Sequence, residues 1–184
     1  MRTEHELRAS LIGGPPASGP VVLAEYDASW PQLFAREEER IGDALGERAL
    51  RIEHVGSTSV PRLAAKPIID IVLVVADSAD EESYVPALTA AGYVLRVREP
   101  EWFEHRLFKG LATSVNVHVF SSGCPEIERM LLLRDWLRRN EADRELYERT
   151  KRELAQKPWE FVQHYADAKG EVVEAIIARA RAAR

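Results

Sequence analysis

A run of ten mostly apolar residues, 67–76, constrains the fold of this chain more than any other feature of its sequence. β-branched side chains fill the run almost continuously, which is typical of a central strand that is buried on both faces. Asp70 lies inside this run. An unpaired buried carboxylate costs on the order of several kcal/mol. Asp70 therefore needs a base, a metal ion or a hydrogen-bond network beside it.

Length and composition exclude several classes of protein. The 184 residues suit one domain with a single core. The formal net charge of -5 argues against a general nucleic-acid-binding protein, which usually carries a basic stripe. The single cysteine, Cys124, excludes an internal disulfide and fits the reducing cytosol. The run 67–76 is too short to span a bilayer, and the N-terminus has no apolar signal-peptide core. We therefore expect a cytoplasmic protein whose partners include neither membrane nor nucleic acid.

Composition divides the chain into three parts. Residues 1–20 end in a stretch rich in glycine and proline, which predicts a flexible leader. Residues 21–124 predict an α/β core. Residues 125–184 predict a helical segment that packs on this core, so that the whole chain forms a single compact unit. The predicted fold class is α+β, a small mixed sheet with flanking helices and a helical C-terminal third.

Apolar periodicity and turn residues place the individual elements. A helix is expected to begin at Ser29-Trp30-Pro31, with Ser29 as its cap. The close spacing of the last three strands implies antiparallel hairpins rather than crossover connections. The other expected elements are a short edge strand at 21–24, strands at 50–55, 67–76, 93–98, 102–109 and 114–120, a helical turn at 61–65, a helix at 81–91, and three C-terminal helices that break near Asn140 and at Lys157-Pro158.

Gly56-Ser57-Thr58-Ser59 precedes the buried run and has the composition of a phosphate-binding turn. A glycine lets the backbone approach a ligand closely, and hydroxyl and amide groups donate hydrogen bonds to phosphate oxygens. An ordinary turn with a helix cap explains the same four residues, and taken alone they favour this plainer interpretation.

Two polar side chains alternate with valines on the last predicted strand. Asn116 and His118 therefore share one face of that strand. If the strand neighbours the one that carries Asp70, the three side chains converge, and Asp70 and His118 become a candidate catalytic pair. His105, on the preceding strand, is a further candidate.

A divalent metal ion is one candidate partner for Asp70. A carboxylate and a neutral imidazole are reasonable ligands for Mg²⁺, Mn²⁺ or Zn²⁺, with His118 and His54 as the candidate imidazoles. An Asp–His hydrogen bond without any metal fits the same residues. A third interpretation is a structural carboxylate that pairs with Lys66 or Arg106.

Basic side chains stand beside tyrosines in the helical third. Tyr147 and Lys151, like Tyr165 and Lys169, are four residues apart, so each pair shares a helix face. Such pairs can bind polyphosphate or stack on a base. An ordinary solvated helix surface is the alternative, because residues 126–184 carry 13 basic and 12 acidic side chains. The candidate phosphate- or nucleotide-binding residues are Gly56, Ser57, Thr58, Ser59, Lys66, Arg106, Arg138, Tyr147, Lys151 and Lys169.

These motifs together resemble the GrpB family of bacterial proteins, which are usually described as predicted nucleotidyltransferases. The resemblance runs from about residue 21 to the end and rests on His54-Val-Gly-Ser-Thr-Ser-Val-Pro, Leu63-Ala-Ala-Lys-Pro-Ile-Ile-Asp70-Ile, Asn116-Val-His118-Val, Arg134-Asp-Trp-Leu-Arg138 and the two Tyr–Lys pairs. It implies a nucleotidyltransferase-like α/β core with trailing helices, and it adds weight to Arg138 and Lys151. Similar domains fused to dephospho-coenzyme A kinase imply a link to coenzyme A or nucleotide metabolism.

Val72 marks a departure from active nucleotidyltransferases, which carry a second carboxylate two residues after the first. Those enzymes use their carboxylates to hold two metal ions at the reacting phosphate. Asp70 alone does not hold two Mg²⁺ ions, because Mg²⁺ prefers several oxygen ligands. A site that combines Asp70 with histidines suits Mn²⁺, Zn²⁺ or Ni²⁺, or holds no metal.

Three functions from different classes are compatible with this sequence. The first is an enzyme of phosphoryl or nucleotidyl transfer, in which the turn, Lys66 and the helix cations hold phosphates while Asp70 and His118 perform the chemistry. The alternative is a non-catalytic module that binds a phosphorylated ligand or docks on an enzyme of coenzyme A metabolism, and Val72 favours it. In a third, the protein is an interaction scaffold whose polar core is structural. The sequence leaves the substrate, the metal and the oligomeric state open.

Overall fold

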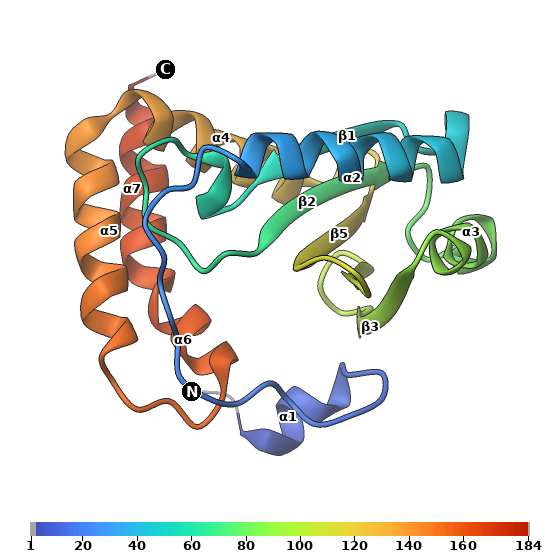
Figure 1. The fold of residues 1–184 in the computed structure, drawn as a ribbon, viewed down its shortest axis with the longest axis horizontal. Coiled ribbons are helices and arrows are strands. Elements are labelled where there is room, and N and C mark those ends of the chain that lie inside the picture. The colour runs from blue at the N-terminus through green and yellow to red at the C-terminus, as the bar shows by residue number, and fades with distance from the viewer. Residues whose placement is uncertain (1–2, 184) are drawn as a thin grey trace.

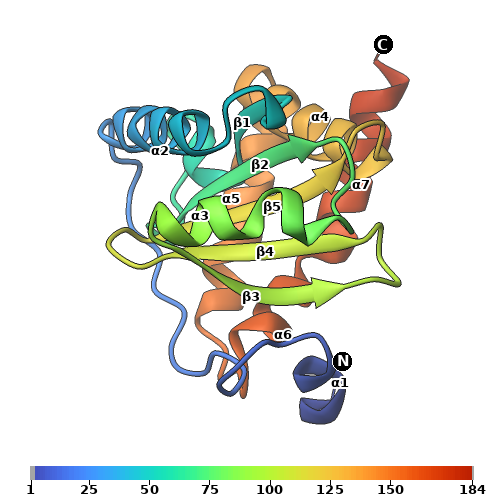
Figure 2. The ribbon, with the colours of Figure 1, turned by 90° about the vertical axis from the view of Figure 1, so that its right-hand side faces the viewer.

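A computed structural model describes residues 3–183 and contains a five-stranded mixed sheet with the order β1-β2-β5-β4-β3. β2 and β5 run parallel, and the other neighbours run antiparallel. Helices flank the sheet on both sides, which confirms the predicted α+β class (Figure 2). The strands are β1 Arg51–Val55, β2 Ile69–Val75, β3 Tyr93–Glu99, β4 His105–Gly110 and β5 Val115–Ser121.

The central strand β2 buries apolar side chains on both of its faces. On one face, Ile71 and Leu73 are fully buried in the main core, beneath the helices α2 (Trp30–Leu45) and α3 (Val85–Ala90). On the other face, Val72 packs in a second cluster that includes residues of the first C-terminal helix. The alternation of side chains along the strand places Asp70 on this second face. The buried run thus forms the central strand that its composition predicts.

Within the described residues, four helices, rather than the three expected, follow the last strand. Asn140 separates the first two and caps the second, because its side chain accepts a hydrogen bond from Asp143 N at 2.9 Å. The additional boundary falls at Lys169, where one helix ends and the next begins. Figure 1 shows the second and fourth of them standing side by side at one end of the sheet. The four are α4 Pro125–Arg139, α5 Glu141–Ala155, α6 Val162–Ala168 and α7 Gly170–Ala182.

Residues 3–20 carry more structure than the flexible leader that their composition predicts. A capping box between Thr3 and Glu6 begins the short helix α1 (Glu4–Ala9). Leu7 of this helix is buried, and Leu11 forms an isolated β-bridge with Val97. The capping box is a local signal that the Gly/Pro-rich composition of the segment conceals.

The helical turn expected at 61–65 is not formed. A 3₁₀ turn, η2 (Ser57–Ser59), comes earlier, and Ala65 forms an antiparallel bridge with Ala24. This bridge keeps the chain extended on its way to β2. The expected strand at 102–109 begins only at His105, because Phe103 and Glu104 adopt left-handed backbone angles that turn the chain. The expected helix at 81–91 is divided into a 3₁₀ turn, η3 (Glu81–Ser83), and α3.

Candidate functional site

Asp70 stands at the start of β2, and the sheet register aligns it with polar side chains of two neighbouring strands. Asn116 of β5 lies directly beside it, and Lys109 of β4 lies beside Asn116. The Asn116 amide donates to Asp70 Oδ1 at 2.8 Å, and His118 Nε2 lies 3.8 Å from the same oxygen. The Asp70 side chain keeps 29% of its surface exposed. The structure thus brings Asp70, Asn116 and His118 together at a partly open point of the sheet.

The surroundings of Asp70 favour its ionised form. Burial alone would raise the pKa of this carboxyl group, but the hydrogen bonds and charge provided by His118, together with Asn116 and Lys66, outweigh it and hold the pKa below its ordinary value. Asp70 is therefore a carboxylate at neutral pH. Such a group can accept a proton, hold a cation or orient a hydroxyl group of a ligand.

A chain of side chains extends from His118 to the edge of the sheet. His118 Nδ1 lies 3.1 Å from His105 Nε2, and His105 Nδ1 lies 2.8 Å from Glu99 Oε2. A carboxylate only accepts, so His105 donates to Glu99 and its other nitrogen accepts from His118. Burial lowers the pKa of His105, which favours the neutral ring that this arrangement needs. The chain fixes the His118 ring with Nε2 toward Asp70.

The turn that precedes β2 packs directly on Asp70. Gly56 has a φ of 68°, and a Cβ atom built on it would lie 2.5 Å from Asp70 Oδ2. Only glycine fits this position, because the backbone must approach the carboxylate and also adopt a left-handed conformation. The close approach makes the turn and the carboxylate one structural unit.

The three hydroxyl groups of the turn have different surroundings. Thr58 donates to Ile68 O at 3.1 Å and accepts from His54 at 3.0 Å, while Ser59 donates to Gly56 O at 2.6 Å. Both of these side chains are buried. Ser57 is only half-buried, and its Oγ lies 3.1 Å from Lys151 Nζ. Among the three hydroxyl groups, Ser57 is thus the one that a ligand can reach.

Lysines from three elements gather around Asp70. Lys66 precedes β2, and the charges of Asp70, Lys169 and Lys109 all act on it. Burial and the two other lysines lower the pKa of Lys66, while Asp70 opposes this effect. The ammonium groups of Lys66 and Lys169 lie 5.8 and 4.9 Å from the ring centroid of Tyr165 in α6. The end of α6 therefore adds positive charge to the site.

Lys151 of α5 also reaches the turn, but it is buried with 2% of its surface exposed. Its ammonium group donates to Ala64 O, contacts Ser57 and lies 4.9 Å from the ring centroid of Tyr147. Glu148, three residues earlier in the same helix, accepts from Ala64 N at 3.2 Å. These contacts fix the loop between the turn and β2 on α5. They also account for Tyr147, which lies against Lys151 rather than in the open part of the site.

Three residues of the predicted site lie apart from Asp70. His54 faces the opposite side of the sheet and stacks on Phe34, and burial lowers its pKa to about 4. Arg106, also on that side, donates to Glu81 at 2.6 Å. Arg138 donates to Ser59 O at 3.0 Å and lines a separate hollow of about 440 Å³ that His54 also borders. For His54 and Arg106, the position along the strand decides this placement, because a single-residue step in register reverses the face of every side chain.

No three His, Cys, Asp or Glu side chains are grouped as metal ligands in the described part of the chain. Of the expected ligands, Asp70 and His118 lie together, whereas His54 contacts Thr58 instead. A cation at this point would therefore take at most two protein side chains from the expected set. Its remaining ligands would have to come from water or from a bound phosphate group.

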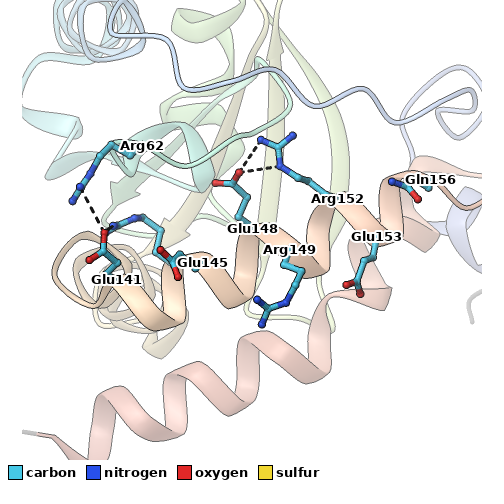
Figure 3. A pocket seen from close by; sticks show the side chains of 9 residues that line it. Arg62, Glu141, Glu145, Glu148, Arg149, Arg152, Glu153 and Gln156 are labelled. Carbon is cyan, nitrogen blue, oxygen red and sulfur yellow. Dashed lines mark hydrogen bonds and ion pairs between the residues drawn. The ribbon is translucent and has the colours of Figure 1, made fainter.

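A second hollow, of about 460 Å³, lies along α5 and is separate from Asp70 (Figure 3). Acidic and basic side chains alternate along it and neutralise one another. Arg62 pairs with Glu141 at 3.8 Å, and Arg152 pairs with Glu148 at 2.7 Å. Charges of both signs on an exposed helix face form a solvated surface rather than a site for an ion of one sign.

Sequence reasoning missed two members of the site, Lys109 and Glu99. Both face Asp70's side of the sheet only because of the register between β3, β4 and β5. The pairing of β3 with β4 includes a bulge between Leu95 and Val97, which alternation along one strand does not reveal. Side chains alternate between the two faces along a strand, so Lys109, four residues after His105, shares the face of His105. This was the one signal in the sequence that could have placed Lys109 at the site.

Comparison with known proteins agrees with this architecture. A model of the GrpB protein family matches residues 20–179. The chain belongs to the GrpB family. A UPF0157 protein of Halalkalibacterium halodurans is 59% identical over 98% of this chain and 93% of its own length, and one of Streptomyces coelicolor is 51% identical over 95% and 91%.

A solved structure of the same family has the same fold. The crystal structure of the conserved protein GrpB from Enterococcus faecalis superimposes with a TM-score of 0.74 at 31% identity, covering 86% of this chain and 96% of that one. A dephospho-CoA kinase of Mycolicibacterium paratuberculosis is 33% identical over 77% of this chain, but the match spans only 41% of the kinase. Within residues 3–183, no helix is long and apolar enough to cross a bilayer.

Proposed function

We propose that this GrpB protein binds a nucleotide or another phosphorylated small molecule at the Asp70 site. The observation that carries the proposal is the lysine cluster. Elsewhere in the described residues, arginines are paired with carboxylates, for example Arg106 with Glu81 and Arg179 with Asp143. Around Lys66, by contrast, the positive charges of Lys169 and Lys109 oppose its own, and Asp70 is the carboxylate that acts on it. Phosphate groups are the natural counter-charge for such a cluster.

The resemblance to nucleotidyltransferases supports a transfer reaction at the same site. Asp70 is ionised, and His118 is held beside it, so the pair can accept a proton from an attacking hydroxyl group. A divalent cation held by Asp70 and His118 would supply charge neutralisation for the phosphates. Val72 is fully buried in an apolar cluster, so a second carboxylate has no place at this strand position.

A non-catalytic role in binding a phosphorylated ligand is the second candidate, and the buried Val72 favours it. Under both candidates the ligand carries phosphate. The kinase relatives are named for dephospho-CoA, which is itself a phosphorylated nucleotide derivative. We therefore include intermediates of coenzyme A synthesis among the ligands to be tested, and an interaction with dephospho-CoA kinase among the partners.

A thermal-shift panel tests the proposal. Nucleotides and coenzyme A intermediates are added with and without Mg²⁺, Mn²⁺ or Zn²⁺, and mass spectrometry then searches the mixtures for products. A ligand at about a thousand times its dissociation constant stabilises the fold by roughly 4 kcal/mol. We expect Lys66→Ala and Lys169→Ala to lose this shift, whereas Lys157→Ala, at an exposed position, keeps it. A panel without any shift would overturn the proposal.

A product would identify an enzyme, and a shift without product would identify a binding module. Asp70→Asn separates these outcomes further. If the protein is an enzyme, this variant loses turnover while the fold persists. Unchanged turnover would exclude Asp70 from the chemistry.

A further inference from the structure

The amine of Lys151 is a buried basic group that the proposed binding site does not use. Its side chain is 2% exposed, and both of its hydrogen-bond partners, Ser57 Oγ and Ala64 O, are uncharged groups. Glu148 acts on it through its charge, but that carboxylate binds Arg152 and the amide of Ala64. A buried ammonium without a hydrogen-bonded carboxylate is costly, so the neutral amine is favoured.

The electrostatic surroundings agree with this geometry. Burial, together with the neighbouring charge of Lys169, lowers the pKa of Lys151 to about 7. A substantial fraction of the amine is therefore neutral at physiological pH. A neutral amine can donate to Ala64 O and still present its lone pair to a hydroxyl group.

Ser57 presents that hydroxyl group at 3.1 Å. It is half-buried, and it follows Gly56, whose backbone lies against Asp70. The other two hydroxyl groups of the turn are buried and donate to backbone carbonyls. A hydroxyl group within hydrogen-bond reach of a buried basic amine is the arrangement of an activated nucleophile.

We propose that Ser57 is a nucleophile and Lys151 its general base, and that the pair takes a phosphoryl group from a phosphoanhydride held by Lys66 and Lys169. The identity of this donor rests on the proposed function, whereas the nucleophile–base pair does not. Thr58 and Ser59 differ from Ser57 in lacking a neighbouring amine. The assignment gives the buried lysine a role that ligand binding alone does not require.

The first step forms a bond between Ser57 Oγ and the terminal phosphorus while the bond from phosphorus to the bridging oxygen breaks. The leaving phosphate departs with that electron pair, and Lys151 takes the hydroxyl proton. In the second step water attacks the phosphoserine, whose Oγ departs and regains its proton from Lys151. The water protons stay on the released inorganic phosphate, so atoms and charges balance.

A fluorophosphonate probe tests the pair without knowledge of the natural ligand. The full chain is treated with the probe between pH 6 and 9, and the modified peptide is located by mass spectrometry. We expect labelling of Ser57 at a rate that rises through about pH 7 with the titration of Lys151. Lys151→Met should slow labelling roughly 100-fold, since a general base contributes about 10²–10⁴-fold. Unchanged labelling in this variant, or none at Ser57 in the parent, would overturn the proposal.

A cysteine variant keeps the test decisive if Lys151→Met unfolds. Ser57→Cys places a thiol beside the amine, and its alkylation by iodoacetamide is compared with that of Ser18→Cys, which is exposed. We expect faster alkylation of Ser57→Cys at pH 7, because a proton acceptor favours the thiolate. Equal or slower alkylation contradicts the pair. Success here with no shift in the nucleotide panel would leave the nucleophile standing and reject the proposed ligand class.

Discussion

The charges around Glu37 and Arg106 on one face of the sheet differ from those around Asp70 on the other face. On the side of α2 and α3, Glu37 accepts hydrogen bonds from Tyr93 and Thr113, and Arg106 is paired with Glu81. Next to Asp70, on the side of the C-terminal helices, the charges of Lys169, Asp70 and Lys109 all act on Lys66. Charges that are matched within the protein stabilise its structure. An excess of positive charge at a partly open point is instead suited to an anionic ligand. This difference distinguishes the protein core from the candidate site, although both lie on the same strands.

The largest effect on stability is expected on the matched face. Leu73→Ala removes a fully buried side chain from the main core and should lower the free energy of unfolding by about 2–5 kcal/mol. Urea denaturation measures it. The control, Val22→Ala, truncates a side chain that is 67% exposed and should change little. A loss below about 1 kcal/mol for Leu73→Ala would contradict this division between the faces.

Gly56→Ala tests how closely the turn and Asp70 depend on each other. The new Cβ would lie 2.5 Å from Asp70 Oδ2 at a φ of 68°, so we expect a loss of about 1–3 kcal/mol and a displaced carboxylate. Gly46→Ala is the matched control, because Gly46 has a φ of 56° but no atom within 4 Å of its Cβ position. Thermal unfolding of both variants isolates the collision from the backbone strain. Equal losses would show that Asp70 moves aside without cost.

Some features of the sheet could be predicted from local sequence patterns, and others could not. The continuous apolar run identifies β2, and the alternation of Asn116 and His118 with valines identifies their shared face. Both are local patterns. The register between strands decides which side chains of each neighbouring strand lie on the same face as Asp70. This register is set by the turns and bulges between the strands. For this reason Lys109 was missed, and Arg106 was grouped with Asp70 although it lies on the other face.

Long-range packing accounts for the remaining differences. Lys151 and Lys169 come from helices that follow the core, and no local pattern states which of their faces meets the turn before β2. The four-residue spacing from Tyr147 and Tyr165 is common on solvated helices as well. The short turn at Gly56 was recognised as a unit, but the extended path from it to β2 includes a bridge between Ala24 and Ala65, which joins distant parts of the chain.

Asp70→Asn should cost less stability than the core substitution, and its cost should depend on pH. The folded-state pKa of Asp70 is depressed, so its ionised form stabilises the fold above the unfolded value of about 3.9. The difference in unfolding free energy between parent and variant should be full above about pH 5 and should vanish as pH falls through the folded pKa. Urea titrations from pH 3 to 7 measure it. A difference that grows toward acid would show that burial, not pairing, dominates the pKa.

The smallest effect is expected in the charged hollow along α5. Arg62 and Glu141 are 3.8 Å apart, with 72% and 67% of their side chains exposed, so solvent screens the pair strongly. Arg62→Ala should change stability by less than about 0.5 kcal/mol. It should also leave the thermal shift of any phosphorylated ligand unchanged, because the surrounding charges of both signs cancel. If Arg62→Ala lost the ligand-induced thermal shift while Lys66→Ala kept it, we would conclude that the ligand binds in the hollow and not at the lysine cluster.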